Sequence, residues 1–187
     1  MCGELPWDLY YETLDVLERH SIKTTRNRPN VSGLAKLAQW GRNKGTNKYD
    51  RVGIPMRSQN FGMVMKRYGN NGTPNTKFNN PFQPSSNNEK YPLLYEQLKK
   101  LIKAIDKDFE YNTITVNHNF ACLPHYDKAN KSPSLIVALG DYTGGELMVE
   151  GCPIDIQWNP LIMNGSVSKH WTNDFEGERY SIIYYNI

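Results

Sequence analysis

The sequence of 187 residues has no long hydrophobic run. None of its uncharged stretches approaches the ~18–20 apolar residues that a membrane-spanning helix needs. Its first residues, MCGELPWDLYYETLD, carry acids where a signal peptide has basic residues followed by an apolar block. We therefore expect an intracellular protein (cytoplasmic, or in the nucleus or a host cell) that has no signal peptide and makes no membrane contact.

Cysteine is also scarce, since only Cys2, Cys122 and Cys152 are present and they lie far apart. A disulfide framework or a structural zinc site is not expected, and a reducing compartment is the default. Hydrophobic residues make up 39% and charged residues 22%, which excludes the composition of disordered chains. The length suits one well-buried domain and is too short for two of ordinary size.

Charge is unevenly distributed although the net charge is only +3. Residues 1–18 hold five acids and no base, whereas residues 19–67 hold twelve bases and one acid. Residues 104–187 hold five bases and eleven acids. The basic segment 19–67 is compatible with a polyanion partner such as DNA, because phosphate contacts scale with the Lys and Arg on one surface. A solvated charged surface explains the same bias, so charge alone leaves both interpretations open.

The N-terminal part of the chain is predicted to be helices and loops. Apolar residues recur at helical spacing over Leu9–His20 and Tyr91–Ile105, and Leu34–Trp40 fits one helical turn. Residues 69–88 are rich in Asn and Pro and contain almost no aliphatic residues, which predicts a long mobile loop.

After Phe109 the pattern changes to short β-rich runs broken by Pro, Gly and Asn, namely NTITVNHNF, SPSLIVALG, GELMVEG, CPIDIQW, PLIMN and RYSIIYYNI. Six or more short strands without an intervening helix predict a barrel or a small sandwich. We expect a single domain over residues 1–187, with a helical and basic part over 1–110 and a β core over 111–187.

One H-x-D pair, His125 and Asp127, carries the candidate chemistry. Residues two apart in a strand point to the same face, so this imidazole and carboxylate can bind one metal ion together. His170 can close the site from a neighbouring strand. Two His and one carboxylate on one face of a metal ion form the facial triad of non-haem Fe(II) oxygenases. An H-x-D pair by itself is a common chance pattern, and a surface or core histidine is the alternative.

The residues beyond His170 favour the metal interpretation. Arg179 opens the last predicted strand, and Ser181 lies on the same face of that strand. A buried guanidinium binds a carboxylate bidentately, and a hydroxyl two residues further on can add a hydrogen bond. Such a pair suits a dicarboxylic co-substrate that chelates the metal and anchors its far end. A structural Arg–Asp pair at the start of a strand is the alternative.

This order of residues resembles the Fe(II)/2-oxoglutarate-dependent dioxygenases over residues 113–187. Within that superfamily, HYDKANKSPSLIVALGDYTGGEL and LIMNGSVSKHWTNDFEGERYSIIYY are most similar to the ten-eleven translocation and J-binding protein (TET/JBP) group and its short phage and algal-virus members. The cysteine-rich region of the animal enzymes is absent from this sequence. The resemblance implies an α+β fold with a double-stranded β-helix (jelly-roll) core, supported by N-terminal helices and long loops.

The resemblance also implies a set of site residues. His125, Asp127 and His170 match the iron ligands, and Arg179 with Ser181 matches the site for the distal carboxylate of 2-oxoglutarate. Fe(II), 2-oxoglutarate and O2 are the implied cofactor and co-substrates, and ascorbate is an implied stimulant.

Asn117 and Asn119 stand where some relatives carry Asn-x-Tyr near the co-substrate, which implies that both contribute to 2-oxoglutarate binding. The resemblance and the basic segment 19–67 favour the 5-methyl group of a pyrimidine in DNA, 5-methylcytosine or thymine, as the C–H bond that is hydroxylated. Hydroxylation of a protein side chain or a small molecule is the alternative within the class. A non-catalytic nucleic-acid-binding β-barrel is the alternative outside it. No obligate protein partner is evident.

Overall fold

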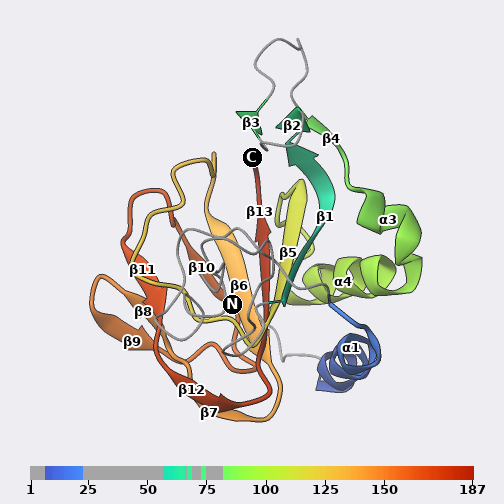
Figure 1. The fold of residues 1–187 in the computed structure, drawn as a ribbon. Helices are drawn as coiled ribbons and strands as arrows, with labels where there is room; N and C mark the ends of the chain where they lie inside the picture. The colour runs from blue at the N-terminus through green and yellow to red at the C-terminus, as the bar shows by residue number, and fades with distance from the viewer. Residues whose placement is uncertain (1–6, 23–56, 66, 69–72, 75–81) are drawn as a thin grey trace, which may run out of the picture.

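The computed structural model describes residues 7–22, 57–65, 67–68, 73–74 and 82–187 (Figure 1). The elements in chain order are α1 (Trp7–Arg19), β1 (Arg57–Met65), β2 (Arg67–Tyr68), β3 (Thr73–Pro74), β4 (Phe82–Pro84), α3 (Ser86–Lys90), α4 (Pro92–Ile105), β5 (Thr113–His118), β6 (Ser134–Leu139), β7 (Tyr142–Gly144), β8 (Leu147–Val149), β9 (Cys152–Ile154), β10 (Leu161–Met163), β11 (His170–Thr172), β12 (Phe175–Gly177) and β13 (Tyr180–Tyr185).

Six strands form the larger sheet, in the order β10-β6-β13-β5-β1-β4, with antiparallel neighbours throughout. β13 lies between β5 and β6, and Ser181 pairs with Asn117 on one side and Ala138 on the other. β5 and β6 are buried along their whole length. Both faces of the central strands are therefore covered, which is why these segments read as nearly continuous β-rich runs in the sequence.

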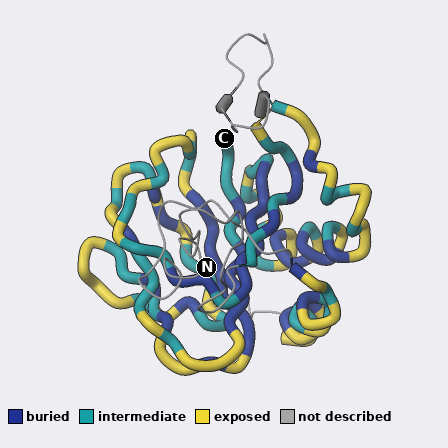
Figure 2. Tube along the Cα trace, in the orientation of Figure 1, coloured by how far each residue is buried: buried dark blue, intermediate teal, exposed yellow. Residues whose placement is uncertain are grey.

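One face of the larger sheet packs against α1 and α4 (Figures 1 and 2). Alternate residues of β13, Tyr180, Ile182 and Tyr184, point to this side and join a core with apolar residues of both helices. The Tyr184 hydroxyl donates a 2.8 Å hydrogen bond to the Leu98 carbonyl of α4. The helices predicted over Leu9–His20 and Tyr91–Ile105 therefore exist as α1 and α4, and they pack against one face of the larger sheet.

The opposite face of the larger sheet meets a second, shorter-stranded layer. This layer contains the three-stranded sheet β11-β8-β9 and the two-stranded ribbon β12-β7. A second hydrophobic cluster fills part of the space between the layers, with Ile136, Leu147 and Ile156 among its buried members. Two antiparallel layers around a shared core, with helices against the larger sheet, confirm the predicted α+β jelly-roll fold.

The sequence analysis did not predict every element. β1 joins the larger sheet beside β5, although its residues were expected to belong to a part made of helices and loops. The predicted loop 69–88 contains β3, β4 and part of α3. The predicted helical turn at Leu34–Trp40 lies outside the described residues. None of the helices in the described part of the chain is long and apolar enough to cross a membrane.

Gly140 allows the end of β6 to approach the start of β13. It has a φ of +122°, and a Cβ atom there would lie 2.1 Å from the Glu178 carbonyl oxygen. The Glu178 amide donates to the Asp141 carbonyl at 2.8 Å, which holds the two segments together. A side chain at position 140 would therefore clash with backbone one residue before Arg179.

Gly140→Ala is expected to lower the free energy of unfolding by about 3 kcal/mol or more, because steric overlap adds to the strain of a positive φ. Gly151→Ala is the matched control, since Gly151 has a φ of +86° but nothing within 4 Å of its Cβ position. That variant should lose only about 1–2 kcal/mol. Urea unfolding of both variants measures the difference, and equal losses would show that the close approach at Gly140 is unimportant.

Candidate active site

Three potential metal ligands converge on the side of the cavity formed by the shorter strands. His170 begins β11, and His125 lies in the segment that follows β5. The two histidines exchange backbone hydrogen bonds of 3.0 Å in each direction, which brings distant parts of the chain together. The Asp127 amide donates to the Gly165 carbonyl at 2.8 Å and fixes the carboxylate next to them. The predicted H-x-D pair and His170 therefore meet in space.

The donor atoms of the three side chains have the arrangement that a metal ion needs. One ligand atom from each of His125, Asp127 and His170 lies within 4.8 Å of the others. The Nε2 atoms of the histidines lie 3.4 Å and 3.5 Å from the two Asp127 carboxylate oxygens. Three converging donors on one side of a common point fit a facial two-His, one-carboxylate site.

Each histidine is oriented by a backbone carbonyl. The Nδ1 atom of His125 bonds the Leu123 carbonyl at 2.7 Å, and that of His170 bonds the Ser168 carbonyl at 3.0 Å. Nδ1 therefore carries a proton, and Nε2 is the nitrogen that faces Asp127. Outer hydrogen bonds of this kind commonly set the tautomer and orientation of metal-binding histidines.

The electrostatics of the cluster favour a cation. Burial alone would raise the pKa of Asp127, but hydrogen bonds and charge from His125 and His170 outweigh it and hold this pKa well below its usual range. Burial disfavours the charged form of His170, yet Asp127 and the Ser168 carbonyl raise the pKa of the imidazole. Asp127 is therefore an anion at neutral pH that stabilises positive charge beside it.

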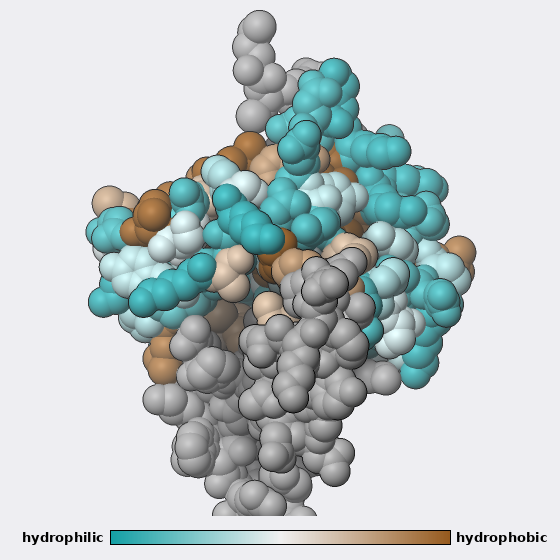
Figure 3. Space-filling view, turned by 90° about the horizontal axis from the view of Figure 1, so that it is seen from above, coloured by the Kyte–Doolittle hydropathy of each residue, from teal (hydrophilic) through white to brown (hydrophobic). Residues whose placement is uncertain are grey.

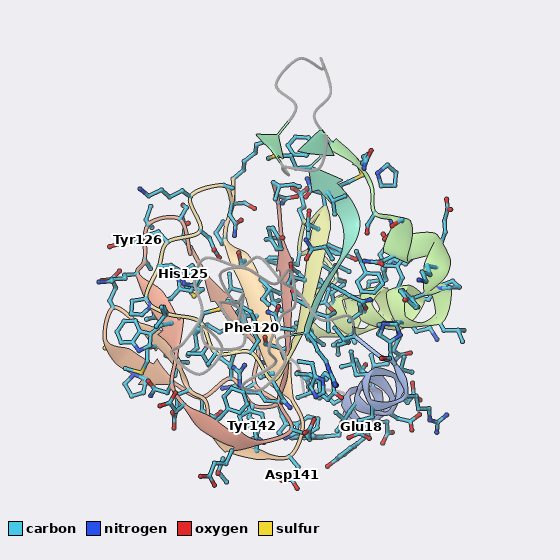
Figure 4. All side chains as sticks on the ribbon, viewed as in Figure 1. Glu18, Phe120, His125, Tyr126, Asp141 and Tyr142 are labelled. Carbon is cyan, nitrogen blue, oxygen red and sulfur yellow. The ribbon has the colours of Figure 1, made fainter. Side chains whose placement is uncertain are left out.

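A cavity of about 750 Å³, part of it open to solvent, extends from these residues along β13. Ser181 lines it from β13, Arg179 from the position just before that strand, and Asn117 from β5. Phe120 also contributes to the wall, and Figure 4 shows it below and to the right of His125. The structure thus brings the predicted metal ligands and three of the four predicted co-substrate residues to one cavity.

Arg179 is a buried cation to which the described residues supply no counter-charge. Only 2% of the residue is exposed, and no carboxylate of the described residues lies within ion-pair distance of it. Its guanidinium stacks over Tyr142 and Phe175, and Nε has no hydrogen-bond partner. Burial lowers the pKa of Arg179, although a guanidinium stays charged at neutral pH. Because an unpaired buried charge is costly, this position fits a bound carboxylate.

Polar groups next to Arg179 provide further hydrogen-bonding atoms at the same place in the cavity. The Asn117 amide nitrogen donates to the Ser181 hydroxyl at 3.2 Å, and the Asn117 carbonyl oxygen is buried without a partner. The Ser181 hydroxyl keeps its own proton available for donation. Arg179 and Ser181 can therefore both donate to one carboxylate.

The structure does not bring Asn119 to the cavity. Its φ of +50° turns the chain out of β5, so the side chain no longer shares a face with Asn117. The Asn119 backbone amide and side-chain oxygen instead bond the carbonyl and amide of Arg179, each at 2.8 Å. Its amide nitrogen donates to Glu178. Asn119 therefore shapes the start of β13 from outside the cavity.

The remaining histidines lie elsewhere. His118 bonds Glu178 and stacks on Tyr180, while His20 bonds Gln59. Sequence reasoning missed Thr115, Asn130, Ile183 and Tyr185, which also line the cavity. Ser181 was selected because it lies two residues after Arg179. The same alternation continued along β13 would have identified Ile183 and Tyr185.

Comparison with solved structures supports the fold in which this site lies. No protein-family model and no curated protein matches the sequence. Among solved structures, the chain is similar to NgTET1 in complex with 5mC DNA, with a TM-score of 0.54 and 16% identity. That match covers 97% of this chain and 69% of the other. The chain has the fold of the Fe(II)/2-oxoglutarate-dependent oxygenases. The structure of OsALKBH1 also matches, with a TM-score of 0.51, 11% identity, and coverage of 97% and 94% respectively.

Gly165 leaves the room that the three ligands require. A Cβ atom at Gly165 would lie 3.1 Å from Cε1 of His170 and 3.3 Å from an Asp127 carboxylate oxygen. Its backbone φ is not in the left-handed region, so Gly165→Ala would add bulk without left-handed strain.

We expect Gly165→Ala to weaken Mn(II) binding by about tenfold or more, because small displacements of ligands strongly affect a metal site. Isothermal titration calorimetry measures the affinity, and urea unfolding of the apo protein should show little change. Gly151→Ala, whose added Cβ atom would have nothing within 4 Å, should bind Mn(II) like the wild type. Unchanged affinity in Gly165→Ala would show that the ligands tolerate the methyl group.

Proposed function

We propose that the protein is an Fe(II)- and 2-oxoglutarate-dependent dioxygenase formed by a single domain within residues 1–187. The observation that carries the proposal is the combination of a two-His, one-carboxylate cluster and an unpaired buried arginine in one cavity. A metal site with a purely structural role would not need the buried Arg179 in the same cavity. A site that binds only an anion would not need the two-His, one-carboxylate cluster. The oxygenase fold supports the same conclusion.

His125, Asp127 and His170 would hold the iron. Imidazole suits iron, and a facial arrangement of three protein ligands leaves positions open for the co-substrates. Bound iron supplies the redox chemistry by which O2, 2-oxoglutarate and a C–H bond yield succinate, CO2 and a hydroxylated product. The protein's part is to bind and orient the reactants, and Asp127 contributes the one negative charge among the ligands.

Arg179 and Ser181 would hold the distal carboxylate of 2-oxoglutarate. The guanidinium gains the counter-charge that the described residues do not provide, and the hydroxyl adds a second donor. Asn117 would orient the Ser181 hydroxyl through the 3.2 Å hydrogen bond between them. The stacked rings of Tyr142 and Phe175 keep the guanidinium in place.

For the substrate, we propose the 5-methyl group of a pyrimidine base in DNA, with DNA bound through basic residues of segment 19–67. The similarity to NgTET1 in complex with 5mC DNA supports this choice. The charge of the segment supports it as well, although residues 23–56 lie outside the described part of the chain. Ascorbate is included as a stimulant because it would keep the iron reduced between turnovers.

The test is mass spectrometry of nucleosides after incubation of methylated and unmethylated DNA with Fe(II), ascorbate and 2-oxoglutarate. Hydroxymethylated pyrimidine together with succinate is the expected result. Asp127→Ala should abolish both, because two neutral imidazoles hold a divalent ion poorly. Succinate formation by Asp127→Ala at the wild-type rate would contradict the metal assignment. Succinate formation by the wild type without any base oxidation would contradict the DNA substrate alone.

Arg179→Lys should raise the KM for 2-oxoglutarate by about tenfold or more and leave Mn(II) affinity nearly unchanged. Lysine keeps the charge but loses the planar pair of donors, and its shorter reach weakens contact with the carboxylate. The loss of about 1.4 kcal/mol of binding energy corresponds to tenfold in affinity. Succinate production at varied 2-oxoglutarate concentration measures KM, and an unchanged KM would assign the carboxylate to another residue.

A further inference from the structure

Cys122 carries a thiol in the candidate active-site cavity, and the proposed function gives it no role. It is half-buried, and of the two described cysteines it alone lines the cavity, whereas Cys152 in β9 is exposed. Part of the cavity is open to solvent. The described residues on the face that Figure 3 shows from above are mostly hydrophilic. A small, water-soluble reagent can therefore reach the cavity lining.

Backbone pairing holds Cys122 at the Arg179 end of the cavity. The Thr172 amide donates to the Cys122 carbonyl at 3.2 Å, and Thr172 pairs with Leu147 in the sheet β11-β8-β9. Two residues before Leu147, Gly145 lies against Arg179, because a Cβ atom there would be 3.0 Å from the Arg179 Nε atom. The segment that bears the thiol and the guanidinium are therefore linked through one short stretch of the chain.

The charge of Arg179 acts at this thiol. Burial lowers the pKa of Arg179, and charge on Tyr142 and on Cys122 opposes that effect, so the thiol lies within electrostatic reach of the guanidinium. The Arg179 Nε atom is buried without a hydrogen-bond partner. Among the described residues that line the cavity, Asp127 carries the one carboxylate, and it lies between the two candidate histidine ligands. A small anion that enters is therefore attracted to Arg179, beside Cys122.

We propose that Cys122 is a modification site for electrophilic carboxylates, which Arg179 binds by the carboxylate and so holds with the reactive carbon beside the thiol. With an α-halo acid, the sulfur–carbon bond forms as the carbon–halogen bond breaks, halide leaves, and the thiol proton goes to water. With an α,β-unsaturated acid, sulfur adds to the β carbon and the proton ends on the α carbon. In both products the attached carboxylate supplies the counter-charge of Arg179.

This modification depends on the cavity and on Arg179, and it does not depend on the proposed oxygenase reaction. It has a consequence for that reaction, because the attached carboxylate occupies the position that the proposed function assigns to the distal carboxylate of 2-oxoglutarate. A modified Cys122 therefore excludes the co-substrate, and bound co-substrate protects Cys122.

The experiment compares iodoacetate with iodoacetamide, which share the reactive carbon and the leaving group and differ in the carboxylate. Peptide mass spectrometry measures the alkylation rate of each cysteine by each reagent, with Mn(II) present. Because both reagents attack the same sulfur, the ratio of the two rates cancels the reactivity of the thiol itself. The ratio of the iodoacetate rate to the iodoacetamide rate should be about tenfold or more higher at Cys122 than at Cys152, the effect of one charge-assisted hydrogen bond.

Cys152 is the matched control within the same protein, since it is exposed and does not line the cavity. Arg179→Gln removes the charge and should lower the ratio at Cys122 to that at Cys152. Succinate, which has two carboxylates and no reactive carbon, should slow the reaction of iodoacetate with Cys122 in the wild type. This measurement tests the role of Arg179 even if Arg179→Gln does not fold.

Equal ratios at the two cysteines of the wild type overturn the inference, and so does a Cys122 that neither reagent alkylates. A high ratio that persists in folded Arg179→Gln, or that succinate does not reduce, overturns it as well. Protection of Cys122 by 2-oxoglutarate supports both the modification site and the proposed function. Selective alkylation that succinate slows and 2-oxoglutarate does not slow supports the modification site and contradicts the assignment of the co-substrate to Arg179.

Discussion

The two-sided burial of β13 is the constraint on which the rest of the structure depends. Tyr180, Ile182 and Tyr184 face the helices, so the intervening residues must face the cavity. A shift of register by one residue would exchange the two sets and place a guanidinium in the hydrophobic core. The packing of α1 and α4 against the sheet therefore fixes which side chains are presented to a ligand, although neither helix contacts the cavity.

The buried guanidinium of Arg179 carries an energetic cost that the fold must offset. Stacking against Tyr142 and Phe175 and the extensive sheet around β13 hold it in place, and no carboxylate of the described part of the chain lies beside it. Such a group stabilises a complex with a carboxylate more than it stabilises the empty protein. Natural proteins commonly concentrate this kind of local instability at binding sites, and it is the reason why the proposed function assigns Arg179 to the co-substrate.

The sequence predicted those features that depend on local spacing. His125 and Asp127 lie two residues apart, and this spacing identified the right pair, although the segment is not a strand and only His125 forms an isolated β-bridge. Asn117 and Asn119 have the same spacing, but the positive φ of Asn119 ends the strand and breaks the alternation, which no local pattern indicated. β1 was missed because its place beside β5 is set by long-range pairing. Asn130 was missed because its place at the cavity depends on the neighbouring Lys131 amide, which bonds the Asn186 carbonyl, and only the folded chain brings these two residues near.

The two walls of the cavity differ in the lengths of their strands. β5, β6 and β13 have six residues each, whereas β8, β9 and β11 on the metal side have three. Short strands with few neighbours open locally at lower free energy than long central ones. Amide hydrogens of the short wall should therefore exchange with solvent well before those of the long wall. Under the proposed function, local opening of this kind would give a route by which a metal ion enters and leaves while Arg179 and Ser181 stay in place.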